Sequence, residues 1–325
     1  MGGVAEAFWV IAPGRGEVRR ETLPEPGPSD VVVRALWSGV SRGTESAVFL
    51  GRVPPAVRGE MRAPFQVGEL PGPVKYGYLS VGVVERGPPA LEGREVFALH
   101  PHQTRYVVPA DAVHPLPDGL PAARAVLAGN METAVNALWD AAPRVGDRVT
   151  VVGAGVVGCL VAGLLAGIPG VEVELVDVDP ARAEQAAALG VTFRMPGTAL
   201  GGRDLVLHAS GNSDGLAAAL SLLGPEGEVV ELSWYADRPV SLPLGEHFHP
   251  RRLAIRSSQV GTVSPARAAR WSASDRLRLA LRLLRDPAYD VLVSGESPFI
   301  ELPEVISKLS APGSGALCHR IRYDP

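Results

Sequence analysis

The residues best suited to carry chemistry lie in a glycine-rich turn near the middle of the chain. An apolar run from Val149 leads into Gly153-Ala154-Gly155-Val156-Val157-Gly158, continues as a helix of small residues, and resumes as a strand before Asp177. This order of strand, glycine turn, helix, strand and acid is typical of a dinucleotide-binding unit. Gly153 makes the tight turn, Gly155 admits a pyrophosphate close to the backbone, and Gly158 lets the helix pack on the strand. The N–H groups of Val156 and Val157 then begin the helix that faces the phosphates.

The acid at the end of the second strand bears on the choice of cofactor. The Asp177 carboxylate can accept hydrogen bonds from both hydroxyls of an adenosine ribose. It would repel the 2′-phosphate of NADP by about 4 kcal/mol for charges ~4 Å apart at an effective dielectric constant of about 20, before screening by solvent. Arg182, further along the same segment, is the one feature that could still favour NADP. We therefore expect NAD to be the cofactor.

The composition excludes several classes of protein. The 325 residues are 46% hydrophobic and 20% charged, with a net charge of −4. A globular, cytoplasmic chain that binds neither nucleic acid nor membranes is therefore expected. Residues 149–168 carry no charged side chain and could be read as a membrane span, but their five glycines argue against one. Cys159 and Cys318 are the only cysteines, which excludes a disulfide framework and a four-cysteine zinc site.

Strand patterns fill the first third of the chain, and strands alternate with helices after it. The predicted early strands are 4–12, 31–37, 73–84, 96–99 and 104–109, with a long surface loop at 51–73. Helical patterns begin near residue 121 and alternate with strands up to residue 257, as in a doubly wound parallel sheet. The end of the chain predicts a helix at 274–285, a strand-like stretch at 290–293, a helix at 302–309 and a strand at 318–323. The predicted fold class is α/β.

Three further motifs give the chain a family resemblance. Residues 38–46 (SGVSRGTES) are similar to the Cys-Gly-x-Cys-Gly-Thr-Asp loop of the medium-chain dehydrogenase/reductase superfamily, and residues 77–84 (GYLSVGVV) to its Gly-His-Glu-x-x-Gly-x-Val motif. Residues 130–134 (NMETA) fall where these alcohol-dehydrogenase-like proteins place a threonine near the nicotinamide. The resemblance covers the chain from end to end. It implies a GroES-like catalytic domain at 1–128, a Rossmann NAD-binding domain at 129–261, and a segment at 262–325 that returns to complete the first domain.

The same resemblance implies how the cofactor and the subunits are arranged. It implies a cofactor in the cleft between the two domains, near the glycine turn and near Arg42, Thr133, Ser210 and Ser233. Residues 257–261 end a sheet strand where the family often pairs subunits edge to edge, so a homodimer is expected.

The metal ligands of the zinc-dependent members are missing from this sequence. Their three ligand positions fall here near Ser41, Tyr78 and Gly129, and Leu79 replaces the acid of Gly-His-Glu. Neutral serine and tyrosine are poor zinc ligands, because zinc prefers thiolate, imidazole or carboxylate. We therefore expect no metal. The pattern Ser-Gly-x-Ser-x-Gly-Thr-Glu resembles the zinc-independent branch that includes bacteriochlorophyllide-type dehydrogenases.

Without zinc, a reacting carbonyl oxygen must be polarised by hydrogen bonds or by a general acid. The candidates lie where the family builds its substrate pocket, and they are Tyr78, Ser41, Thr44 and Glu45. A structural role is the alternative, since Tyr78 could simply fill the space left by a histidine and its metal.

Paired histidines offer a rival metal site. His100 and His102 could act with His247 and His249, since imidazole is a common zinc ligand. Both pairs lie in proline-flanked loops, however, where histidines are expected to be solvated.

The sequence thus predicts an NAD-dependent oxidoreductase that moves a hydride between the nicotinamide and an alcohol or carbonyl group of a small molecule. The alternatives are an NADPH-dependent quinone or enoyl reductase, which Asp177 argues against, and a non-catalytic NAD-binding protein.

Overall fold

The computed structural model describes residues 3–324, which form two compact units. The first unit holds the chain up to Gly129, Leu281–Arg285 and the chain from Val293 onward, and the second holds Asn130–Ala280 and Asp286–Leu292. The predicted α/β class, with one β-rich unit and one Rossmann-type unit, is confirmed. The expected boundary at residue 262 falls inside the second unit.

Residues 262–280 lie in the second unit because they pack on helix α3 (Ala128–Ala141). Arg276 of α7 (Ala273–Leu283) is only 2% exposed, and its guanidinium donates to Glu132 at 3.0 Å and to Asn136 at 2.5 Å. The Trp271 ring lies 5.1 Å from that of Trp139, also on α3. A buried arginine is costly unless it is paired, so these bonds fix the start of α7 to α3.

Two sheets build the first unit. The larger sheet has the strand order β16-β17-β3-β6-β7-β9, with β8 also paired to β3, and the smaller has the order β2-β1-β5-β4. The strands are β1 (Val4–Ala12), β2 (Arg15–Thr22), β3 (Asp30–Val40), β4 (Val67–Gly68), β5 (Val74–Lys75), β6 (Ser80–Arg86), β7 (Glu95–Ala98), β8 (Arg105–Pro109), β9 (Val113–Pro115), β16 (Val293–Pro298) and β17 (Cys318–Arg322).

Strand β3 is the centre of the larger sheet. Val31, Val33 and Ala35 are buried at every second position, which places them on one face of the strand. Strands β6, β8 and β17 all pair with β3 in antiparallel register. Through β17, the end of the chain therefore joins the sheet beside the segment that carries Ser38.

Helices α1 (Arg42–Phe49), α2 (Ala122–Ala125) and α8 (Leu302–Leu309) complete the first unit. The expected surface loop at 51–73 contains a 3₁₀ turn at Pro55–Val57 and the short strand β4. The expected strand-like stretch at 290–293 is wrong, since Pro287–Leu292 is a 3₁₀ helix and β16 begins only at Val293. Tyr289 and Leu292 are both buried, and one turn of helix puts residues at this spacing on the same side.

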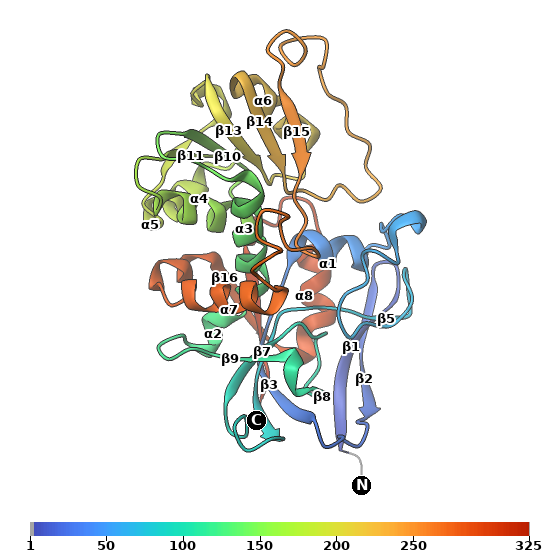
Figure 1. Cartoon of the computed structure of the whole chain (residues 1–325). Helices are drawn as coiled ribbons and strands as arrows, with labels where there is room; N and C mark the ends of the chain where they lie inside the picture. The colour runs from blue at the N-terminus through green and yellow to red at the C-terminus, as the bar shows by residue number, and fades with distance from the viewer. Residues whose placement is uncertain (1–2, 325) are drawn as a thin grey trace. The chain divides into compact units, whose positions relative to one another are not determined.

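A parallel sheet of six strands forms the centre of the second unit (Figure 1). Its order is β12-β11-β10-β13-β14-β15, and every neighbouring pair is parallel. The order reverses between β10 and β13, the point at which open sheets of this kind bind ligands. Its strands are β10 (Arg148–Val152), β11 (Glu172–Val176), β12 (Thr192–Arg194), β13 (Arg203–His208), β14 (Leu223–Glu231) and β15 (Ala254–Ser257). Helices α4 (Val156–Ala166), α5 (Ala183–Ala188) and α6 (Ser213–Leu222) connect them.

One buried carboxylate links four neighbouring strands of this sheet. Glu174 of β11 accepts hydrogen bonds from Thr150 of β10 at 2.9 Å and from Arg194 of β12 at 2.7 Å. Arg203 of β13 lies 2.8 Å away, and its side chain is 4% exposed. The Glu174 side chain, itself 3% exposed, is thus paired on every side, as burial of a charge requires.

Among residues 3–324, no helix combines the length and the apolar character needed to span a bilayer.

Candidate functional site

The glycine turn has the geometry that its sequence predicts. Gly153 has a φ of +105°, and a Cβ there would lie 2.6 Å from the Ser210 nitrogen. A Cβ on Gly158 would lie 1.8 Å from the Gly153 carbonyl oxygen, so the start of α4 packs directly on the turn. Apart from its immediate surroundings along the chain, no atom of residues 3–324 lies within 4 Å of a Cβ built on Gly155, which leaves its backbone open to a ligand. The half-buried Val156 and Val157 form the first turn of α4, whose free N–H groups suit an anion.

Asp177 holds the turn from the end of β11. Its carboxylate accepts from the Ala154 N–H at 2.7 Å and from the Asp179 N–H at 2.9 Å. Each carboxylate oxygen can accept a second hydrogen bond, and the side chain is only half-buried. Asp177 therefore combines a structural role with the capacity to accept the ribose hydroxyls that the sequence predicts for it.

The cationic side chains near Asp177 are paired with other acids. Arg182 lies 3.3 Å from Asp179, and its side chain is 12% exposed. Arg194 donates to Glu174. Neither arginine is a freely extended side chain of the kind that binds a 2′-phosphate on a surface.

Ser210 and Ser233 follow the ends of the neighbouring strands β13 and β14. The Ser233 hydroxyl accepts from the Gly211 N–H at 3.0 Å. The Ser210 hydroxyl lies 2.6 Å from Nε2 of His208, whose Nδ1 lies 2.8 Å from Glu231. Sequence analysis missed His208 and Glu231, although each is the final residue of its strand and the two are partners in the parallel register.

The two remaining predicted cofactor residues lie on helices. Thr133 is half-buried in α3. Arg42 begins α1, and its guanidinium donates to the Ser314 hydroxyl at 3.2 Å.

All four predicted catalytic residues come together in the first unit. The hydroxyl of half-buried Tyr78 forms hydrogen bonds with the Ser41 and Thr44 side chains. The Glu45 carboxylate accepts from the Ser41 N–H at 2.7 Å and lies close enough to Tyr78 to act on its charge. We call these four residues the Tyr78 cluster.

The environment of Tyr78 keeps its phenol protonated. Burial raises the pKa of Tyr78 to about 12, and the Glu45 carboxylate contributes to the increase. The hydrogen bonds with Ser41 and Thr44 act in the opposite direction but do not cancel the increase. At neutral pH the phenol can therefore donate a hydrogen bond or a proton.

The positions that correspond to zinc ligands also lie together, but their side chains do not fit zinc. A Cβ on Gly129 would lie 3.8 Å from the Tyr78 ring and 2.6 Å from the Leu79 side chain. Two neutral hydroxyls and a glycine are a poor donor set for zinc. Within residues 3–324, no group of three or more His, Cys, Asp and Glu side chains is arranged to hold a metal ion.

A buried chain of hydrogen bonds extends from the Tyr78 cluster. Glu45 lies 2.8 Å from Nε2 of His102, and Nδ1 of His102 lies 2.7 Å from the Ser38 hydroxyl. Ser38 in turn lies 2.9 Å from the Tyr323 hydroxyl. We call these four residues the sealed chain, because all of them are buried.

The prediction that His100 and His102 are solvated is wrong. His102 is 1% exposed because its segment is held against β1, where the Phe8 N–H donates to the His102 carbonyl at 3.0 Å. The His100 ring stacks on Tyr106 with centroids 3.8 Å apart, and burial lowers the pKa of His100 to about 3. His247 and His249 are exposed and belong to the second unit.

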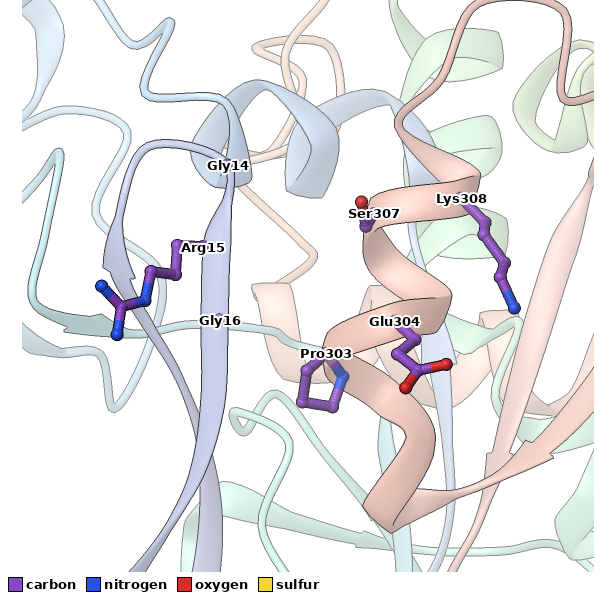
Figure 2. Close-up of a pocket in the computed structure, with 7 residues that line it drawn as sticks. All are labelled: Gly14, Arg15, Gly16, Pro303, Glu304, Ser307 and Lys308. Carbon is purple, nitrogen blue, oxygen red and sulfur yellow. The ribbon is translucent and has the colours of Figure 1, made fainter.

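A separate hollow of about 390 Å³ lies between the β1–β2 hairpin and α8 (Figure 2). Its lining residues are Gly14, Arg15, Gly16, Pro303, Glu304, Ser307 and Lys308, and none belongs to the Tyr78 cluster. Figure 2 shows the Arg15 and Lys308 side chains pointing in opposite directions. The hollow therefore lacks a converging set of charged groups.

Comparison with solved structures establishes the fold. The chain is similar to a protein from Sinorhizobium meliloti 1021, described as a candidate zinc-binding dehydrogenase bound to NADP, with a TM-score of 0.78, 18% identity, and coverage of 98% of this chain and 99% of the other. It is also similar to L-idonate 5-dehydrogenase from Escherichia coli K-12, with a TM-score of 0.80, 15% identity, and coverage of 99% of both chains. The fold is that of alcohol-dehydrogenase-like enzymes.

A third similar structure was solved with the other nicotinamide cofactor. It is an Escherichia coli CFT073 protein, described as a short chain alcohol dehydrogenase complexed with NADH, with a TM-score of 0.77, 17% identity, and coverage of 99% of this chain and 100% of the other. No protein-family model matches the chain, and a search of curated proteins finds no match. At these identities the likeness extends to the fold, and the activity must be argued from the site.

Proposed function

We propose that the chain is an NAD-dependent oxidoreductase that moves a hydride between the nicotinamide and an alcohol or carbonyl carbon of a small molecule, without zinc. The observation that carries the proposal is the geometry of the glycine turn. The backbone is accessible at Gly155, α4 packs against the turn at Gly158, and the Asp177 carboxylate accepts a hydrogen bond from the Ala154 N–H. These features suit a dinucleotide pyrophosphate beside an acid that can accept ribose hydroxyls. The dehydrogenase fold supports the same reading.

NAD is the proposed cofactor because of the charges around the end of β11. A 2′-phosphate would face the Asp177 carboxylate, while Arg182 and Arg194 already pair with Asp179 and Glu174. The similar structures include one bound to NADP and one bound to NADH, so they do not distinguish the two cofactors.

Tyr78 is the proposed proton donor. The bound nicotinamide supplies the hydride, and the substrate oxygen needs a proton as its carbon is reduced. Tyr78 stays protonated at neutral pH, and Ser41 and Thr44 fix the position of its hydroxyl. Such a positioned acid contributes about 10²–10⁴-fold to a rate.

Two copies of the chain are proposed to pair through β15. This strand is at the edge of the parallel sheet, and Ala254 and Arg256 on it are exposed. An open edge offers unpaired N–H and C=O groups to a second copy.

The cofactor assignment is tested by calorimetric binding of NADH and NADPH to chelator-treated protein. We expect NADH to bind at least about tenfold more tightly, which corresponds to ~1.4 kcal/mol. Asp177→Asn keeps one oxygen to accept from the turn but removes the charge, so the preference should shrink. Glu184→Gln, at an exposed acid further along the same segment, is the control and should preserve the preference. Equal or tighter binding of NADPH would overturn the choice of NAD, and failure to bind either cofactor would overturn the enzyme assignment.

The role of Tyr78 is tested by hydride transfer in a screen of alcohols and carbonyl compounds. Tyr78→Phe should lower turnover by about 10²-fold or more while NADH affinity stays unchanged. Tyr76→Phe is the matched control, because the Tyr76 ring lies 6.3 Å from that of Tyr78 and its hydroxyl donates to the Met61 carbonyl at the long distance of 3.5 Å. Equal turnover in the two variants would remove Tyr78 from the mechanism. A protein that binds NADH but transfers hydride to no acceptor would be a binding protein.

A further inference from the structure

A second Ser–His–Glu arrangement is formed within the second unit and shares no residue with the Tyr78 cluster. Nε2 of His208 is 2.6 Å from the Ser210 hydroxyl, and Nδ1 is 2.8 Å and 2.9 Å from the two Glu231 oxygens. His208 and Glu231 end two neighbouring strands, so the sheet itself holds them side by side. We call these three residues the open triad.

The contacts of His208 fix its tautomer. A carboxylate only accepts hydrogen bonds, so Nδ1 must carry the proton that it donates to Glu231. In the neutral ring, Nε2 is then an acceptor and receives the hydrogen of the Ser210 hydroxyl. This is the arrangement in which a histidine can remove a proton from serine as general base.

The surroundings of the triad keep its acid ionised and its histidine in place. The Ser233 N–H donates to Glu231 at 2.7 Å, and the Tyr235 hydroxyl donates to it at 3.0 Å. Burial alone would raise the pKa of Glu231, but hydrogen bonds from His208 and Ser233 bring it below its usual value. His208 is completely buried, whereas Ser210 is exposed. The residue that carries the nucleophilic hydroxyl is thus exposed while its base is buried.

The backbone around Ser210 suits an acyl-transfer site. Helix α6 begins at Ser213, shortly after Ser210, with Asn212 as its cap. The positive end of the helix dipole can stabilise a negative oxygen that develops near Ser210. A Cβ on Gly215 would lie 2.3 Å from the Ser210 hydroxyl oxygen and 2.9 Å from Nε2 of His208, so only glycine leaves this pair undisturbed.

We propose that Ser210 is a nucleophile that accepts acyl groups from small carboxylic esters, with His208 as its base and Glu231 as the positioning acid. The Ser210 oxygen forms a bond to the ester carbonyl carbon while its proton moves to Nε2 of His208. The bond from that carbon to the alcohol oxygen breaks, and the leaving oxygen takes the proton. Water then hydrolyses the acyl-serine by the same route, releasing a carboxylic acid. No redox partner is needed, and the proposal does not depend on the dehydrogenase activity.

The test uses the full chain without added nucleotide, a fluorophosphonate probe that labels activated serines, and p-nitrophenyl acetate as substrate. We expect labelling at Ser210, located by peptide mass spectrometry, together with slow release of p-nitrophenol. Ser210→Ala should abolish the labelling, and Glu231→Gln should lower its rate by about 10²-fold. Ser221→Ala is the matched control, because Ser221 is an exposed serine on α6 whose hydroxyl bonds only to the Ala218 carbonyl. It should label as the parent protein does.

The variant Gly215→Ala tests whether labelling of Ser210 requires its hydrogen bond with His208. Its Cβ displaces the Ser210 hydroxyl from His208 while all three members of the triad remain, so labelling should fall at least about tenfold. Circular dichroism and thermal unfolding check that each variant is folded. Absence of labelling in the parent chain would overturn the proposal, as would labelling of equal rate in the Gly215→Ala and Glu231→Gln variants and the parent. Should Glu231→Gln fail to fold, Gly215→Ala and Ser210→Ala still decide the outcome.

Discussion

Each of the two units contains a serine, a histidine and a glutamate in one hydrogen-bonded line, yet the two lines have different surroundings. In the sealed chain the serine is 0% exposed and the glutamate 5%, and a tyrosine hydroxyl closes the line at 2.9 Å from Ser38. In the open triad the serine is exposed and only the histidine is completely buried. The ring nitrogens are used in opposite senses, since Glu45 lies at Nε2 of His102 and Glu231 at Nδ1 of His208.

The difference teaches that residue types alone do not decide between structure and chemistry. Ser38 has partners on both sides, His102 and Tyr323, so its hydroxyl is occupied and no substrate can approach it. The Ser210 hydroxyl has its base at 2.6 Å and accepts from the Asn212 N–H at 3.3 Å, and the residue itself is exposed. The sealed chain should therefore contribute to stability and the open triad to reactivity.

Removal of each histidine should give the largest difference in stability between the two lines. His102→Ala removes the partner of one oxygen of the buried Glu45 carboxylate and one of the two partners of the buried Ser38 hydroxyl, which should lower the free energy of unfolding by about 3–5 kcal/mol. His208→Ala leaves Glu231 with the Ser233 N–H and the Tyr235 hydroxyl, so the loss should be about 1–3 kcal/mol. Urea unfolding measures both, with exposed His247→Ala as the control near zero. An equal loss in the two variants would contradict the distinction.

As the pH falls, the stability of the two units should begin to decrease at different pH values. The pKa of His100 is about 3 in the folded first unit against 6.5 in an unfolded chain, so unfolding takes up a proton as pH falls below 6.5. Between pH 6.5 and 4.5 this should remove about 2–3 kcal/mol from the stability of the first unit. The pKa of Glu231 lies below 4.5, so its contribution to the second unit is lost only as pH falls below 4.5.

Hydrogen exchange of the β3 and β13 amides between pH 4.5 and 7 would follow the two units separately. The variant His100→Phe keeps a ring against Tyr106 but cannot titrate, so it should flatten the response of β3 alone. A response of β3 that is unchanged in this variant would assign the acid sensitivity to other groups.

Replacing the serine of each line should give a smaller difference in stability than replacing the histidine. Ser38→Ala removes the partner of the buried Nδ1 of His102 and one partner of the Tyr323 hydroxyl, at a cost of about 1–3 kcal/mol. Ser210→Ala also removes the partner of Nε2 of the buried His208, but at an exposed residue where water can take its place, so a smaller loss of about 0.5–1 kcal/mol is expected. Thermal unfolding of the pair gives the comparison, and a larger loss for Ser210→Ala would reverse our assignment of roles.

The smallest difference in stability is expected between variants of the two tyrosines, Tyr323 and Tyr235, that are hydrogen-bonded to the ends of the two lines. Tyr323→Phe removes one partner of the buried Ser38 and should cost about 1 kcal/mol. Tyr235→Phe removes a donor to the less buried Glu231, and about 0.5 kcal/mol is expected. Denaturant midpoints at a constant slope resolve the two, provided that at least three repeats agree.

Features set by local spacing could be predicted from the sequence, and features set by distant pairings could not. Strand, turn, helix and acid follow each other within one short segment, which is why the roles of Gly153, Gly158 and the parallel sheet could be predicted. The sealed chain joins Ser38 to His102 and to Tyr323 across 64 and 285 positions. No local pattern encodes such contacts, because they arise only when β17 pairs with β3 and the His102 segment is held against β1.

The open triad was within closer reach of sequence analysis. Ser210 and Ser233 were predicted as cofactor residues, but the two side chains between them in the hydrogen-bond network were not. His208 and Glu231 are neighbours because β13 and β14 pair in parallel register. Aligning the last residues of the two predicted strands would have placed these side chains next to each other. An ionisable residue at the end of each of two adjacent apolar strands is the signal that was available.

The carboxylate of Glu174 also acts as a check on how the second unit assembles. Its partners come from β10, β12 and β13, so all of them meet it only when the four strands stand in their native sequence across the sheet. A chain that placed β13 elsewhere would separate the buried Arg203 from Glu174, and one that placed both β12 and β13 elsewhere would leave the buried Glu174 without a counter-charge, at a penalty of several kcal/mol. Apolar contacts between valines and leucines are similar for any pair of neighbouring strands, whereas the ion pairs of Glu174 form only with the strands that carry its arginine partners. Glu174 thereby destabilises sheets with a different strand order, which apolar packing alone would allow.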